Sequence, residues 1–102
     1  MKNILKKRIK SVEDIYKSAM KMIEIDRGDD NSDLLLTVKT ICLTEMELFD
    51  LHAISLADFI KVKISHFSGE GKIAQYNKKK YGEKNTIKYV QVLKELLKNN
   101  EI

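Results

Sequence analysis

The chain has 102 residues, of which 43% are hydrophobic and 33% charged, with no proline or tryptophan and a single cysteine. This length predicts one helical domain over residues 1–102, and the composition is typical of a folded chain rather than a disordered one. A single cysteine excludes an internal disulfide, so we expect a cytoplasmic protein, in the host cytoplasm if its source is viral. The sequence contains no run of about eighteen apolar residues, so it predicts no membrane span, and we expect no membrane partner.

Charge is distributed unevenly along the chain, although the net value is only +4. Residues 1–10 carry a net charge of +5, residues 11–50 carry −6, and residues 72–102 carry +5. The chain is therefore basic at both ends and acidic in its middle. Such a layout indicates either a solvated surface or a basic patch for an acidic partner such as nucleic acid.

The first two predicted helices rest on apolar residues that recur at helical spacing. One apolar stripe predicts a helix over residues 12–25, with Ser11 as its N-cap. A second helix is expected to begin after Ser32 or Asp33 and to end near residues 50–53. Apolar residues lie nearly all round this second helix, which predicts that it is central and covered on several sides.

The next two helices differ strongly in charge. A helix over residues 56–67 is predicted from its apolar stripe, with Ser55 as the N-cap. A short and very basic helix near residues 73–81 follows, and Gly82 is expected to end it. The residues predicted to line one side of this basic helix are Ile73, Tyr76, Asn77, Lys80 and Tyr81.

The last helix is expected over residues 86–98, after a turn over residues 81–85 in which Asn85 is the N-cap. A proline-free chain rich in Lys, Glu, Leu, Ile and Met favours helix throughout. The predicted fold class is therefore all-α, a compact bundle of four to five helices. The side chains of the last helix expected to face the core are Ile87, Val90, Leu93, Leu96 and Leu97.

Two of the predicted helices resemble each other in sequence. Residues 11–17 align without gaps with residues 55–61. The apolar stripe continues in step beyond them, except where Ala19 is aligned with Lys63. The two segments are offset by 44 residues. A repeat of about this length is typical of helical-hairpin repeats. Because any two serine-capped amphipathic helices look alike, internal duplication and chance similarity both remain open.

Under duplication, the two repeats would span residues 11–50 and 55–98, with a basic insertion near residues 73–81. Each repeat would then form a helical hairpin, and the two hairpins would pack about a pseudo-twofold axis. A groove between such repeated units is a natural binding site.

No residue pattern in the chain predicts catalysis or a metal site. Cys42, His52 and His66 do not stand at zinc-binding spacing, and the acidic residues 26–33 lack the pattern of a calcium-binding EF-hand loop. No nucleophile has a base at a recognisable spacing. We therefore expect a non-catalytic protein with no cofactor and no metal.

The most informative segment for function begins at Lys72, where lysines alternate with tyrosines toward the C-terminus. Lysines contact the phosphates of nucleic acids, and tyrosines stack on bases or donate hydrogen bonds to the sugar–phosphate backbone. This combination predicts a nucleic-acid-binding surface. The candidate binding residues are Lys72, Lys78, Lys79, Lys80, Lys84, Asn85, Thr86, Lys88 and Tyr89.

Residues 73–90 combine a short basic helix, a turn that contains Gly82, and an N-capped helix. This order resembles the helix-turn-helix family of DNA-binding domains, whose second helix enters the major groove. The glycine stands five residues before Ile87, whereas the family pattern has six. By resemblance, Asn85, Thr86, Lys88 and Tyr89 would read bases, and Lys78, Lys79 and Lys80 would hold phosphates.

These features predict a small regulator that binds nucleic acid, DNA in preference to RNA, through its basic C-terminal third. The alternative is a protein-interaction module, such as an adaptor, an inhibitor or a viral accessory protein. In that alternative, the groove between the repeats or the acidic face of residues 24–33 binds a peptide or a partner helix. A homodimer is compatible with either hypothesis. Convergence of Lys78–Lys80 with Lys84 and Lys88 on one surface would favour nucleic acid.

Overall fold

The computed structural model of the chain describes the backbone of residues 2–25 and 31–100, and the side chains of residues 10–25 and 31–100. Within these ranges the chain forms α-helices and no β-strand, so the predicted all-α fold is confirmed. The radius of gyration is 13.5 Å, close to the roughly 13 Å of a compact chain of this length. The helices are α1 (Lys2–Ile25), α2 (Ser32–Leu48), α3 (Leu56–Phe67), α4 (Lys72–Tyr81) and α5 (Glu83–Asn100).

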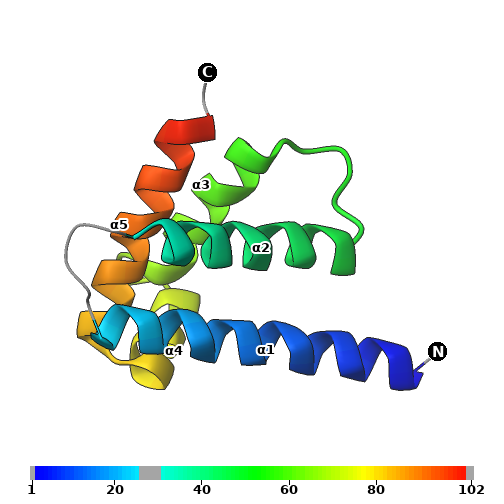
Figure 1. Cartoon of the computed structure of the whole chain (residues 1–102), viewed down its shortest axis with the longest axis horizontal. Coiled ribbons are helices and arrows are strands. Elements are labelled where there is room, and N and C mark those ends of the chain that lie inside the picture. The colour runs from blue at the N-terminus through cyan, green and yellow to red at the C-terminus, as the bar shows by residue number, and fades with distance from the viewer. Residues whose placement is uncertain (1, 26–30, 101–102) are drawn as a thin grey trace.

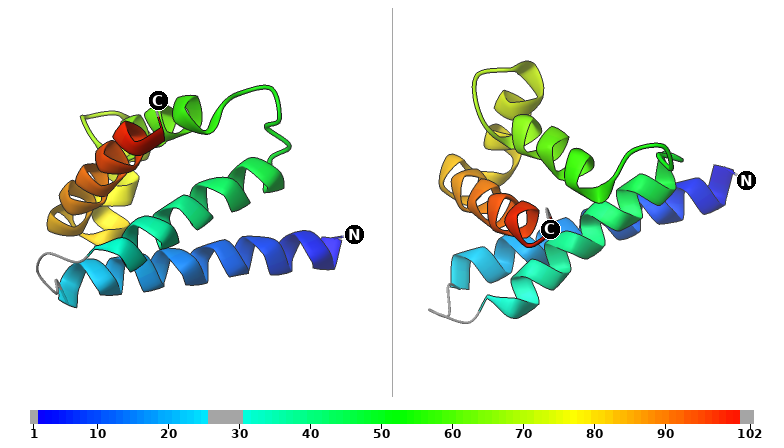
Figure 2. Two further views of the ribbon diagram at one scale, coloured as in Figure 1. Left: turned by 45° about the horizontal axis from the view of Figure 1, so that its top comes forward. Right: turned by 90° about the horizontal axis from the view of Figure 1, so that it is seen from above.

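The helices form a bundle built on one antiparallel pair. α1 and α2 run side by side in opposite directions, and α3, α4 and α5 gather over the end of this pair where α1 finishes and α2 begins (Figure 1). The N-terminal part of α1 and the C-terminal part of α2 extend beyond the other three helices (Figure 2). The most extensive contacts join α1 to α2 and α3 to α5.

α5, rather than α2, takes the central position. It packs against all four other helices. The prediction that α2 is covered on several sides is wrong for its outer face, where Leu36 and Leu43 are 64% and 46% exposed. Only one side of α2, which carries Val38, Ile41 and Cys42, is buried.

The first helix begins earlier than its apolar stripe predicts. α1 starts at Lys2, not near residue 12, and Ser11 lies inside it rather than at its N-cap. Residues 2–10 contain neither proline nor glycine and consist mostly of Lys, Arg, Leu and Ile. Since most of these residues favour helix, nothing in the segment stops helix formation before the apolar stripe begins.

α2 begins at Ser32, slightly earlier than expected, with Asn31 rather than Ser32 or Asp33 at its N-cap, and it ends at Leu48, before the predicted residues 50–53. Asp50 adopts a φ of 56°, a left-handed conformation in which a right-handed helix cannot continue. The bounds predicted for α3 are confirmed. Its N-cap is also confirmed, because the Ser55 Oγ accepts a hydrogen bond of 3.1 Å from the Asp58 backbone N–H.

α4 and α5 are separated by Gly82 alone. Gly82 ends α4 with a φ of 94°, which confirms its predicted role as C-cap. The predicted turn over residues 81–85 is wrong, because α5 already begins at Glu83. An acidic side chain in the first turn stabilises this early start. Asn85 consequently lies inside α5 and is not an N-cap.

The two most extensively packed pairs, α1 with α2 and α3 with α5, are those that an internal duplication would form. In such a scheme α4 is the inserted element. Whether the pairs arose by duplication stays a prediction.

Candidate nucleic-acid interface

Apolar contacts fix the inner face of α4 to the bundle. Ala74 is buried, and the Tyr81 ring stacks on the rings of Tyr16 and Phe67, with centroids 5.8 and 6.2 Å apart. Burial raises the pKa of the Tyr81 hydroxyl. An aromatic cluster drawn from several helices is a rigid support, because each ring is held by the others.

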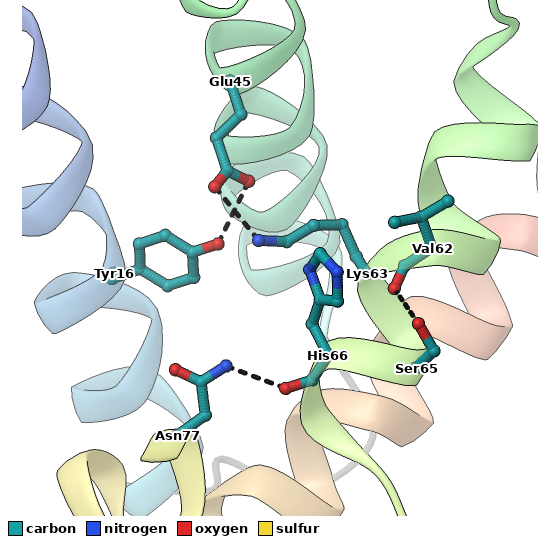
Figure 3. Close-up of polar contacts among 7 residues, drawn as sticks. All are labelled: Tyr16, Glu45, Val62, Lys63, Ser65, His66 and Asn77. Carbon is teal, nitrogen blue, oxygen red and sulfur yellow. Dashed lines mark hydrogen bonds and ion pairs between the residues drawn. The ribbon is translucent and has the colours of Figure 1, made fainter. Parts of the chain in front are cut away.

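Two polar contacts join α4 to the end of α3. The Asn77 side chain donates a 2.8 Å hydrogen bond to the His66 carbonyl oxygen (Figure 3). The Lys78 Nζ donates a 2.7 Å hydrogen bond to the Gly69 carbonyl oxygen in the α3–α4 connection. Lys78 is therefore half-buried and tied to the backbone. This contact engages the ammonium that the resemblance assigns to a phosphate.

The opposite face of α4 carries lysines around one aromatic ring. Lys72, Lys79 and Lys80 are exposed, and Tyr76 is 63% exposed. Lys72 precedes Tyr76 by four residues and Lys79 follows it by three, so helical geometry places all three on one face. α4 contains no acidic residue. We call Lys72, Tyr76, Lys79 and Lys80 the α4 outer face.

The α4 outer face includes Tyr76, which is not among the binding residues predicted from the sequence. Tyr76 was predicted to share one side of the helix with Asn77 and Tyr81, but only these two point inward, and Tyr76 is exposed. The sequence feature that could have predicted its exposure is that lysines, Lys72 and Lys79, stand one helical turn before and after it and therefore share its face. In a helix of ten residues, this spacing identifies the outer face better than apolar character does.

Lys80 connects the outer face to the aromatic support. Its Nζ lies 5.8 Å from the Tyr76 ring centroid and 5.4 Å from the Tyr81 ring centroid. Both distances are within the range of a cation–π contact. The ammonium is thus held over the exposed Tyr76 ring, while the Lys80 side chain as a whole remains exposed.

Two of the four α5 residues that the helix-turn-helix resemblance assigns to base reading are not available for it. Thr86 and Tyr89 are fully buried. The Thr86 Oγ1 donates to the Glu83 carbonyl oxygen, and the Tyr89 ring centroid lies 4.6 Å from that of Phe67. Their assignment as binding residues is therefore wrong.

The inward face of α5 is rotated from the one predicted. Ile87 was expected in the core but is 53% exposed, whereas Tyr89 was expected at the surface and is buried. The larger ring buries more apolar area and completes the aromatic cluster with Phe67 and Tyr16, which outweighs burial of one isoleucine. Val90, Leu93 and Leu96 are buried as predicted.

The remaining predicted residues of α5 divide into tied and exposed side chains. The Asn85 Nδ2 donates hydrogen bonds to the Tyr81 carbonyl oxygen at 3.0 Å and to Glu24 Oε1 at 2.9 Å, so this residue fixes α5 to α1. Lys88 is half-buried. Lys84 is exposed in the first turn of α5, across the Gly82 joint from α4.

A second group of polar side chains lies inside the bundle, where α1, α2 and α3 meet (Figure 3). Lys63 Nζ and Glu45 Oε2 form an ion pair of 3.0 Å, with side chains only 9% and 11% exposed. The Tyr16 hydroxyl donates a 3.0 Å hydrogen bond to Glu45 Oε1. The Lys63 ammonium also lies 5.4 Å from the ring centroids of Tyr16 and Phe67. We assign this cluster a structural role, because its charges face each other rather than solvent.

Neighbours of this cluster have displaced pKa values. Burial is the main cause for Tyr16 and Tyr89, whose hydroxyl pKa values lie well above their usual range. Burial also raises the pKa of the Cys42 thiol to about 12, so this thiol stays protonated at neutral pH. The pKa of the His66 imidazole is lowered by burial and then by the positive charge of Lys63.

Among residues 2–25 and 31–100, no three His, Cys, Asp or Glu side chains lie close enough together to hold a metal ion. The acidic residues 26–30, considered above as a calcium loop, lie outside the described residues. In the same part of the chain, every helix is too short or too polar to cross a membrane.

Comparison of the chain with protein-family models, with curated proteins and with solved structures finds no match.

Proposed function

We propose that this chain is a non-catalytic regulator that binds nucleic acid through the α4 outer face. The observation that carries the proposal is the grouping of three exposed lysines around exposed Tyr76 on a helix without acidic residues. Each lysine can neutralise one backbone phosphate and release the counterions condensed on it. Lys84 extends this basic surface into the first turn of α5.

The mode of binding differs from that of a helix-turn-helix domain. Thr86 and Tyr89 are buried and Asn85 is tied to Glu24, so α5 presents few groups that could read base edges. Contacts to phosphates position a protein without carrying sequence information. We therefore expect affinity that depends strongly on salt and little on sequence.

Replacing Lys72, Lys79 and Lys80 together by alanine tests this proposal. Three phosphate contacts predict a log–log salt slope of about −2.7 on duplex DNA, or an affinity loss of about 40-fold between about 50 and 200 mM salt. In the triple variant, binding should become weak at low salt, and the slope should shrink to no more than about −0.9, the contribution of one contact from Lys84. Fluorescence anisotropy with labelled oligonucleotides measures both. Lys78 is left intact because its contact with Gly69 anchors α4.

A charge-matched control separates the α4 surface from the net charge of the protein. Lys10, Lys17 and Lys21 are exposed on α1, and their replacement by alanine removes the same three charges. This control should bind nucleic acid nearly as well as the wild type. Equal loss of affinity in the two triple variants would show that the α4 outer face has no special role.

The protein-interaction alternative is favoured by a different observation. An open depression of about 550 Å³ is lined by Leu43, Met46 and Glu47 of α2 and by Leu51, His52 and Ile54 after it. Leu43 and Ile54 are exposed large apolar side chains, and carboxylates of Glu47 and Asp50 lie on the same short segment. A partner helix with an apolar face and basic flanks would complement this surface.

This depression lies at the end of α2 and not between the two helix pairs, where the sequence placed a groove. It uses none of the α4 lysines. The two proposals therefore predict binding at different surfaces of the same molecule.

A further inference from the structure

Tyr76 differs from the other tyrosines of the chain in its surroundings. Tyr16, Tyr81 and Tyr89 contribute their rings to the aromatic cluster inside the bundle. Tyr76 is instead 63% exposed as a residue, at the centre of the α4 outer face. An exposed aromatic ring that contributes little to the core, and that lysines surround, is an arrangement suited to a planar anionic ligand.

The lysines around Tyr76 lie at distances that suit one strand of nucleic acid. Lys72 and Lys79 flank the ring one helical turn before and after it, which separates their Cα atoms by about 10 Å along the helix axis. Lys80 holds its ammonium 5.8 Å from the ring centroid. Because this ammonium lies over one face of the ring, a base would stack on the opposite face. Lys72 and Lys79 would then lie on either side of the base, where they can contact the phosphates that precede and follow it.

The available side chains favour an unpaired base over a base pair. In a duplex, the bases stack on one another and expose only their edges, whereas a single strand can present the face of a base. The α5 residues that could have read edges are buried or tied, as shown for Thr86, Tyr89 and Asn85. The chemistry that the α4 outer face exposes is stacking combined with phosphate contact.

We propose that Tyr76 is a stacking platform for an unpaired base, so that the protein prefers single-stranded to double-stranded nucleic acid. This inference rests on the proposed function and specifies its ligand. Lys72, Lys79 and Lys80 bind the phosphates of the strand, and the Tyr76 ring contacts the base. Three phosphate contacts on a single strand predict a log–log salt slope of about −2.1.

The test compares Tyr76→Ala with Tyr76→Phe in anisotropy titrations against oligo(dT), oligo(rU) and a duplex of equal length. On oligo(dT), Tyr76→Ala should lose about 5- to 150-fold in affinity, the range measured when a stacking aromatic is removed. Tyr76→Phe keeps the ring and should bind like the wild type. Duplex binding should be weaker in the wild type and unchanged by either variant. The oligo(rU) arm shows whether the platform accepts RNA as well as DNA.

A direct readout of stacking comes from Tyr76→Trp. The chain contains no tryptophan, so this variant has one indole, and it reports only on position 76. Quenching of its fluorescence by oligo(dT), but not by the duplex, would support the inference. Absence of quenching, or unchanged oligo(dT) affinity in Tyr76→Ala, would overturn it even if the triple lysine variant loses binding. Failure of the wild type to bind any of the three ligands at low salt would instead overturn the proposed function, and this inference with it.

Discussion

At the scale of single residues, Lys63 shows how a charged side chain can join three helices. It lies in the apolar stripe of α3, at the position where the aligned segment of α1 has Ala19. Its buried ammonium pairs with the Glu45 carboxylate of α2, with Nζ and Oε2 3.0 Å apart. The Tyr16 hydroxyl of α1 donates a hydrogen bond to the other carboxylate oxygen. Removing charges from water is costly, so the lysine and the glutamate can be buried only together.

Lys63→Met should therefore destabilise the fold more than the loss of one contact would imply. Glu45 would remain buried without its cation, and we expect the free energy of unfolding to fall by about 3–5 kcal/mol. The double variant Glu45→Met/Lys63→Met removes both charges at similar volume and should recover most of this loss. Urea unfolding followed by circular dichroism measures both changes. A double variant no more stable than Lys63→Met would contradict the assignment of a buried ion pair.

The sequence could not identify this pair in advance. Lys63 interrupts an apolar pattern, which signals only that the position is unusual, and Glu45 lies within the apolar run of α2. The two residues are far apart along the chain, and only packing of α2 against α3 brings them together. The contact of Asn85 with Glu24 could not be predicted from the sequence for the same reason, because Glu24 lies on the distant helix α1.

At the scale of elements, Gly82 decides how α4 presents its outer face. It is the only residue between α4 and α5, and its φ of 94° with a ψ of 141° turns the chain between them. This region of backbone conformation is nearly restricted to glycine. A Cβ atom at Gly82 would meet no atom within 4 Å, so conformation rather than space requires glycine here.

Gly82→Ala should consequently destabilise the protein by about 1–3 kcal/mol, the cost of holding a non-glycine residue in this conformation. Gly71→Ala is the matched control, because a Cβ there also meets no atom within 4 Å but its φ is −64°. We expect the control to change stability less than Gly82→Ala does. Thermal unfolding of the two variants measures the difference, and equal effects would show that the α4–α5 joint is not strained.

The bounds of the helices follow from sequence only where local signals are strong. α3 was predicted correctly because Ser55 caps its start and a glycine-containing segment follows its end. The starts of α1 and α5 were wrong because residues that favour helix precede both stripes. The inward face of α5 was wrong because Tyr89 packs on Phe67, a contact between distant residues that periodicity does not reveal.

At the scale of the whole molecule, the two candidate binding surfaces lie on different parts of the bundle. α4 lies near the end where α1 finishes, whereas the α2–α3 connection lies toward the N-terminal end of α1 (Figures 1 and 2). Residues of this connection line the depression. The basic α4 outer face suits a polyanion, and the apolar and acidic depression suits a basic helix. Of the lysines predicted to bind nucleic acid, Lys72, Lys79, Lys80 and Lys84 are exposed, but Lys78 is anchored to the backbone and Lys88 is half-buried.

Mapping the binding surface by NMR tests the central claim most directly. The measurement follows backbone amide shifts of the ¹⁵N-labelled protein during titration with oligo(dT). We predict that the largest shifts occur in α4, between Lys72 and Lys80, and at Lys84, while amides lining the depression, such as Leu43 and Ile54, remain unchanged. Shifts centred on the depression, or no shifts at low salt, would contradict the claim that the α4 outer face binds nucleic acid.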